Sequence, residues 1–146
     1  MKWVTRKNIR VNRVATAWLI RRFIDANAEF IFVEPDAVAR VQREQGAKGF
    51  DAPGATYPHK DKKGRCSFEA LVAEYCANDP VLKQIALIVR GADFPEEIKL
   101  TTESAGLRLI SQGFPAVAKD DHDTLEKASF IYDALYAALT ASMNER

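Results

Sequence analysis

The sequence has few of the features that mark disulfide-rich, membrane-bound or nucleic-acid-binding proteins. Its 146 residues include only two cysteines, Cys66 and Cys76, which form no CxxC pair and are too few for a disulfide framework. No apolar run approaches the roughly 20 residues of a membrane span. The net charge is +1, so no overall attraction to nucleic acid or to an anionic membrane is expected. We therefore expect a cytoplasmic protein with reduced thiols, no membrane partner and no direct nucleic-acid binding by this domain alone.

Several enzyme signatures are also missing. The sequence contains no glycine-rich phosphate loop, no Gly-x-Ser-x-Gly elbow and no zinc-finger spacing. Near the N-terminus the apolar letters AWLI run directly into Arg21 and Arg22, so we expect no signal peptide. A chain of this length with 47% hydrophobic residues can bury one core. We interpret residues 1–146 as a single domain.

The order of strand and helix patterns predicts a mainly helical α/β fold. A small βαβαβ sheet at the N-terminus is expected from strands at 3–5, 29–33 and 49–51 and helices at 11–26 and 35–45. Two prolines and two glycines predict a surface loop over residues 52–65. A C-terminal set of helices should pack against the sheet, at 67–76, 80–91, 102–113 and from about 120 onward.

The predicted helix at residues 11–26 carries charged residues within an apolar surface. On a wheel at about 100° per residue, its apolar side chains cover an arc of roughly 260°, which is typical of a helix surrounded by the rest of a fold. Arg13, Arg21 and Asp25 fall inside this arc, and Arg22 lies at its edge. Two interpretations stay open: Arg21 forms an internal ion pair with Asp25 four residues away, or the three arginines bind a tetrahedral oxyanion.

Imidazole and carboxylate side chains form a candidate metal site. His122 and Glu126 are four residues apart on the predicted last helix, so both can face one point. His59, Glu69 and Asp93 would come from other segments. This mixture of donors suits a divalent metal such as zinc, iron or manganese. The alternative is that the acidic residues only cap the helix and that His122 is exposed in its first turn.

Cys66 is the candidate reactive thiol. It follows Lys62, Lys63 and Arg65 and is expected at a helix N-terminus, and both features lower a thiol pKa. A thiolate there could reduce or bind an oxidising oxyanion. Inert packing is the alternative for Cys66, and we expect Cys76 to behave as a small hydrophobic residue.

An ordered series of short motifs resembles a known family. The sequence reads WLIRRFID, FIFV, RCSFE, VRGAD, DDH and YDALYA. This series is similar to the bacterial chromate-resistance family, which also forms the C-terminal domain of ChrB-type chromate-responsive regulators, and it spans Lys2 to about Ala138. The resemblance implies participation in chromate resistance, in which some members are named as exported and others are regulatory domains. From the length of the chain, we expect it to lack the regulators' additional N-terminal domain. The family's Cys-Pro before Trp-Leu-Ile is replaced by Thr16-Ala17, so any chemistry of that thiol is absent.

These patterns lead to three functional hypotheses. The first is an accessory or sensor domain in chromate resistance that binds chromate, sulfate or a metal ion at a polar site. The second is a metal-dependent redox or hydrolytic enzyme, with Cys66, Glu69 and Asp93 as the catalytic candidates. The third is a regulatory interaction module without catalysis. A homodimer is compatible with all three.

Overall fold

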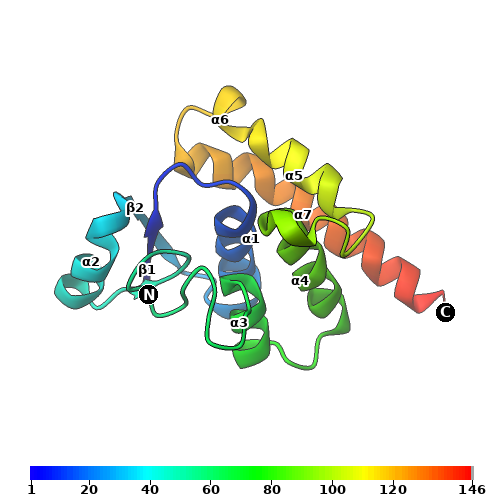
Figure 1. Ribbon diagram of the computed structural model, residues 1–146, viewed down its shortest axis with the longest axis horizontal. Helices are drawn as coiled ribbons and strands as arrows, with labels where there is room; N and C mark the ends of the chain where they lie inside the picture. Colours follow the sequence, from blue (N-terminus) through cyan, green and yellow to red (C-terminus); the bar gives the residue numbers. More distant parts are fainter. Residues whose placement is uncertain (146) are drawn as a thin grey trace.

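The computed structural model describes residues 1–145 and has the predicted mainly helical α/β architecture (Figure 1). None of the helices in this described part combines the length and the apolar character that a membrane span needs. The strands are β1 (Lys2–Arg6), β2 (Glu29–Val33) and β3 (Lys48–Gly49). The helices are α1 (Val11–Leu19), α2 (Val38–Gln45), α3 (Ser67–Tyr75), α4 (Pro80–Asp93), α5 (Ser104–Gln112), α6 (Phe114–Val117) and α7 (Asp121–Asn144), with a π-helical turn η1 (Ile20–Ile24) and 3-10 turns η2 (Pro35–Ala37) and η3 (Pro95–Glu97).

The small N-terminal sheet has β1 at its centre. Its order is β2-β1-β3, both pairings are parallel, and Trp3 lies beside Phe30 on one side and Lys48 on the other. Parallel neighbours need crossover connections, and α1 and α2 supply them, which confirms the predicted βαβαβ order. The third strand is shorter than expected and begins earlier. Phe50 forms an isolated bridge and Asp51 takes a left-handed backbone conformation with φ 50°, so the chain turns away from the sheet there.

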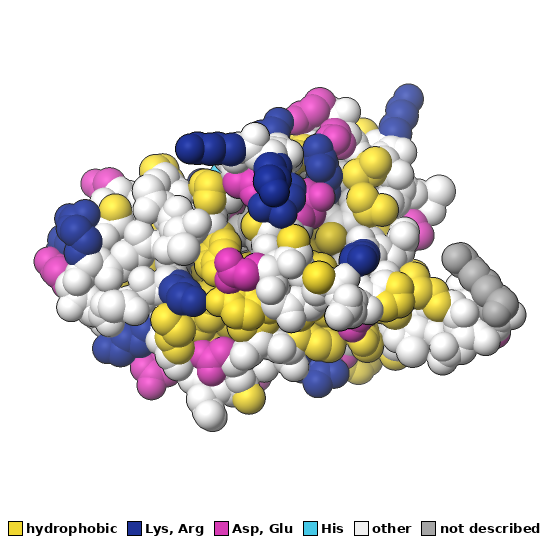
Figure 2. All heavy atoms as spheres, turned by 90° about the horizontal axis from the view of Figure 1, so that it is seen from below, with side chains coloured by type: hydrophobic (Ala, Val, Ile, Leu, Met, Phe, Trp, Pro, Cys, Tyr) yellow, Lys and Arg dark blue, Asp and Glu magenta, His cyan; other side chains and the backbone are white. Residues whose placement is uncertain are grey.

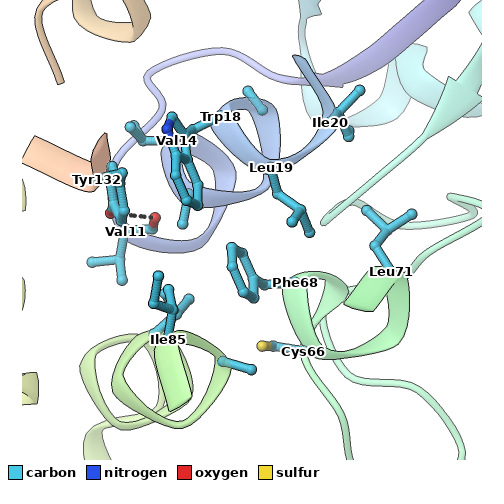
Figure 3. Packing of buried hydrophobic residues seen from close by; sticks show 14 of the residues in the cluster. Val11, Val14, Trp18, Leu19, Ile20, Cys66, Phe68, Leu71, Ile85 and Tyr132 are labelled. Atoms are coloured by element: carbon cyan, nitrogen blue, oxygen red, sulfur yellow. Dashed lines mark hydrogen bonds between the residues drawn. The ribbon is translucent and has the colours of Figure 1, made fainter. Parts of the chain in front are cut away.

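Helix α1 is enclosed by the rest of the fold, as its wide apolar arc predicts. It packs against α3, α4, α5 and α7, and every residue of α1 except Arg13 is buried. The rings of Trp18 and Tyr132 lie 5.6 Å apart, and the Tyr132 hydroxyl donates to the carbonyl of Val11 at 3.4 Å (Figure 3). Figure 3 also shows Phe68 of α3 pointing toward α1. Burial of each large apolar side chain contributes about 1.5–3 kcal/mol to stability.

The predicted helix over residues 11–26 changes form after Leu19. In η1, the Asp25 amide donates to the carbonyl of Ile20 at 2.7 Å, which adds one residue to the turn. Asp25 is extended, and its carboxylate accepts from Nε1 of Trp3 at 3.0 Å and pairs with the N-terminal amine at 3.1 Å. The predicted pair between Arg21 and Asp25 is therefore wrong, because the wider turn and the end of the helix remove the spacing that would bring them together.

Helices α4 and α5 also differ from the expected boundaries. Helix α4 does not end at Gly91 but continues to Asp93. A Cβ at Gly91 would lie 2.3 Å from Oγ of Ser104, so this glycine permits the close approach of α5 to α4. Helix α5 begins at Ser104, two residues later than predicted, and the Ser104 amide donates to Oγ1 of Thr101 at 3.1 Å.

Candidate functional site

A small polar pocket lies where the start of α1 faces the end of α4 and one side of α5. Its volume is about 200 Å³, below the roughly 300–1,000 Å³ of pockets that hold drug-sized ligands. A larger hollow of about 490 Å³ lies beside the turn between α3 and α4, and none of the predicted site residues line it. The small pocket is lined by Arg10, Val11, Asn12, Arg13, Asp51, Asp93, Arg108 and Gln112.

Local structure fixes the direction from which Arg13 enters this pocket. Asn8 has a left-handed backbone with φ 63°, and the Asp121 carboxylate accepts the backbone amides of Asn8 and Ile9, each at 2.9 Å. These bonds tie the turn before α1 to the N-terminus of α7. Nη2 of Arg13 then donates to the carbonyl of Asn8 at 2.8 Å. On the opposite side, the two residues by which α4 extends past Gly91 bring Asp93 to the pocket.

Asp51 is the centre of a cluster of charged side chains. Its own side chain is 2% exposed. Arg6 donates to the Asp51 carbonyl at 2.7 Å and to the Asp51 carboxylate at 3.3 Å. The same carboxylate is 3.4 Å from Nη1 of Arg13 and 2.7 Å from Nδ1 of His59. The hydrogen bond to Asp51 raises the pKa of His59 above its ordinary value. Several cationic partners thus compensate the buried charge of Asp51.

Asp93 and Arg13 each have a buried polar atom without a hydrogen-bond partner among residues 1–145. These atoms are Oδ2 of Asp93 and Nε of Arg13. Oδ2 lies 3.6 Å from Nδ1 of His59, whose shorter contact goes to Asp51. Burial, followed by the nearby charge of Asp51, raises the pKa of Asp93 to about 6, and burial lowers the pKa of Arg13. The site therefore holds both an acceptor and a donor that the described protein does not use.

The pocket brings together some residues that the sequence predicted from separate motifs. Arg13 and Asp93 line it, and His59 contacts both Asp51 and Asp93, although the three were assigned to different roles. Sequence reasoning missed Arg6 and Asp51. A signal for them existed, because Arg6 ends β1 and Asp51 closely follows β3, and the carboxyl ends of neighbouring parallel strands lie at one edge of a sheet, where ligands commonly bind.

The other two predicted oxyanion residues, Arg21 and Arg22, do not line this pocket. Arg21 pairs with Glu126 of α7 at 3.1 Å, and its guanidinium lies 5.1 Å from the ring centroid of Phe30. Arg22 pairs with Asp133 of α7 at 2.9 Å. Both ion pairs have exposed members, so each contributes little to stability beyond tying η1 to α7.

The five residues predicted to bind a metal lie in different surroundings. His122 is exposed with its ring edge-on to Phe32, centroids 4.8 Å apart, and Glu126 is paired with Arg21. Glu69 pairs with Arg90 at 3.4 Å. Only His59 and Asp93 approach each other. Within residues 1–145 no group of three or more His, Cys, Asp or Glu side chains is arranged to hold a metal ion.

Cys66 is buried in the core rather than poised for reaction (Figure 3). Burial raises its pKa well above the ordinary thiol value, which contradicts the expected lowering. Lys62 and Lys63 are exposed in the loop, and Nε of Arg65 pairs with Asp61 at 2.8 Å. These three basic residues therefore do not offset the free-energy cost of ionising the Cys66 thiol in an apolar interior.

The fold and the pocket define an α/β domain with a charged site near the carboxyl ends of its strands. Over residues 3–139 the chain matches the family described as "ChrB, C-terminal domain", and it belongs to that family. It is 33% identical over 136 residues to Protein ChrB of Cupriavidus metallidurans, and the match covers 92% of this chain and 40% of that protein. No solved structure matches the chain significantly. The chain therefore spans less than half the length of this curated relative.

Proposed function

We propose that this domain binds a small tetrahedral oxyanion in the pocket beside Arg13 and acts in this way as an accessory or sensor domain in chromate resistance. Arg10, Arg13 and Arg108 line the same pocket of about 200 Å³. Guanidinium groups present planar sets of N–H donors that match oxyanions better than ammonium groups do. The observation that carries the proposal is the buried Nε of Arg13, a donor with no acceptor among residues 1–145.

The wall around Arg13 supports a preformed site. The Asn12 side chain donates to Oγ of Ser67 at 2.7 Å, and the hydroxyl oxygens of Thr16 and Ser67 are hydrogen-bonded at 3.1 Å. These buried bonds lock α1 against α3. Nη1 of Arg108 donates to the carbonyl of Ala92 at 3.0 Å, which holds α5 at the end of α4. Residues that are fixed before the ligand arrives lose less conformational entropy on binding.

The positive charge that favours an anion is local to the pocket. On the face shown in Figure 2, Lys and Arg side chains lie among Asp and Glu side chains and a central band of hydrophobic ones. In the site, Asp51 is compensated by Arg6, Arg13 and His59, so Asp93 is the remaining carboxylate that lines the pocket with Arg10 and Arg108. A small anion would gain most where guanidinium groups converge away from bulk water.

Ligand-induced stabilisation tests this proposal. The melting temperature is measured at pH 7.5 with chromate, phosphate, arsenate, sulfate or molybdate, against sodium chloride of equal ionic strength. At least one oxyanion should raise it in a saturable way, because a ligand of the native state stabilises by mass action. Arg13→Ala should abolish the effect. Arg22→Ala is the matched control, since Arg22 lies outside the pocket, and it should retain the effect.

Two results would contradict oxyanion binding at this pocket. One is the absence of stabilisation by all five anions, and the other is an unchanged response in folded Arg13→Ala. Removal of divalent metals with EDTA should leave the response intact, because the proposed contacts are guanidinium groups. A response that disappears with EDTA and returns with added metal would favour a metal held by His59 and Asp93, as in the enzyme hypothesis.

A further inference from the structure

Asp93 is an acceptor in a pocket whose other charged lining groups are mainly donors. It is the last residue of α4, where the helix dipole already disfavours negative charge. Its side chain is 15% exposed, and its Oδ2 has no hydrogen-bond partner among residues 1–145. A buried acceptor without a partner lowers the stability of the folded protein. We therefore expect Asp93 to have a function other than stabilising the fold. The charged groups around it are Arg6, Arg10, Arg13, Asp51, His59 and Arg108.

The nearby cationic groups make their closer contacts with Asp51 rather than with Asp93. Arg6 and Arg13 direct their guanidinium contacts to Asp51, and Nδ1 of His59 is 2.7 Å from Asp51 but 3.6 Å from Asp93. The terminal torsion of a carboxylate is soft, so Asp93 can present either oxygen to the pocket that it lines. An ionised carboxylate there would repel an oxyanion oxygen that carries only lone pairs. It would accept a hydrogen bond from an oxyanion oxygen that carries a proton.

We infer that Asp93 selects oxyanions that carry a proton and thereby separates phosphate, arsenate and the protonated form of chromate from sulfate. This inference rests on the proposed function, because it assumes that the Arg13 pocket holds the anion. Chromate, phosphate and arsenate are weak acids that retain or gain a proton near neutral pH, whereas sulfate does not. Arginine contacts alone would not distinguish sulfate from chromate, since the two share shape and charge. The O–H of the protonated ligand would donate to the Asp93 carboxylate while the guanidinium groups bind its other oxygens.

Four anions at one pH test this selectivity by calorimetry. At pH 7.5 phosphate and arsenate are mainly dianions with one proton, and sulfate and molybdate are dianions without one, so net charge and shape are matched. The wild-type protein should bind the first pair at least about tenfold more tightly, since a hydrogen bond to a charged group is worth that much or more. Asp93→Asn should remove the preference by strengthening sulfate and weakening phosphate binding. Asp133→Asn makes the same chemical change at the ion pair with Arg22, and this variant should keep the preference for phosphate and arsenate.

The outcomes separate the two proposals. Binding of all four anions without discrimination, or tighter binding of sulfate than of phosphate by the wild type, would overturn the selectivity and leave oxyanion binding standing. A folded Asp93→Asn protein that keeps the wild-type ranking would do the same, because Asp93 would then be only structural. Failure of all four anions to bind would overturn both. The relative affinities of the four anions for the wild-type protein test the selectivity without any variant. If Asp93→Asn does not fold, Asp93→Ser is a second variant for the same comparison.

Discussion

Replacing Asp93 with asparagine should stabilise the protein at pH 8 and change its stability little at pH 4.5. The pKa of this carboxyl rises from an ordinary 3.8 to about 6 in the folded protein. The folded state therefore binds more protons than the unfolded state between these values, and stability falls as the pH rises through that window. Above it, the wild type bears a cost of about 3 kcal/mol, at 1.36 kcal/mol per pKa unit. Asparagine is neutral throughout and bears no such cost.

Urea unfolding of both proteins at several pH values between 4 and 8.5 measures this difference. The free energy of unfolding of Asp93→Asn minus that of the wild type should increase by about 1–3 kcal/mol across the range, allowing for relaxation around the ionised group. Asp133→Asn, at an exposed ion pair, should give a difference that varies little with pH. A difference for Asp93→Asn that is flat, or that decreases as the pH rises, would refute the argument that its ionisation destabilises the fold.

Three further predictions concern the neighbourhood of the site and the core. His59→Gln should destabilise the protein more at pH 5.5 than at pH 9. The raised pKa of His59 adds stability below its ordinary pKa of 6.5, and this stability is lost as the pH rises through the pKa in the folded protein. Urea unfolding at both pH values measures the difference. Gly91→Ala should lower stability by roughly 1–3 kcal/mol, seen as a lower melting temperature, because the new methyl group would meet Ser104 at 2.3 Å. An aromatic disulfide reagent should modify the partly buried Cys76 well before the fully buried Cys66, and mass spectrometry showing equal rates in the native protein would contradict the described burial.

Periodicity predicted the parts of the fold that depend on local sequence and on burial. The aromatic and β-branched run EFIFV became β2, and the wide apolar arc of residues 11–24 became a helix that other helices enclose. The pair Asp79-Pro80 is typical of a helix start, and the Asp79 carboxylate accepts the amides of Val81 and Leu82 at 2.9 and 3.0 Å. Each of these features is determined by one short segment of the chain, so it can be predicted from a single sequence.

The contacts within the site depend on which of several possible partners each side chain meets in the folded protein. A single sequence does not specify this. Arg21 had Asp25 at helical spacing, but the π-helical turn removed that contact and the side chain pairs with Glu126, which is 105 residues away. The neighbouring basic residues left two interpretations of Cys66 open, an activated thiol or inert packing, and the packing of α3 buries it. Asp51 belongs to the site because its backbone is left-handed after a very short strand. Each outcome is set by tertiary packing, which overrides local spacing.

The location of a bound oxyanion tests the central claim most directly. Crystals of the wild-type protein soaked in arsenate, with diffraction recorded at the arsenic absorption edge, would place the anion by its anomalous signal. We expect one strong peak in the pocket among Arg10, Arg13 and Arg108, with an arsenate oxygen within hydrogen-bond distance of Asp93, and no such peak in Arg13→Ala crystals. Arsenate bound only at other positions, or a peak of equal height in the Arg13→Ala crystals, would contradict it.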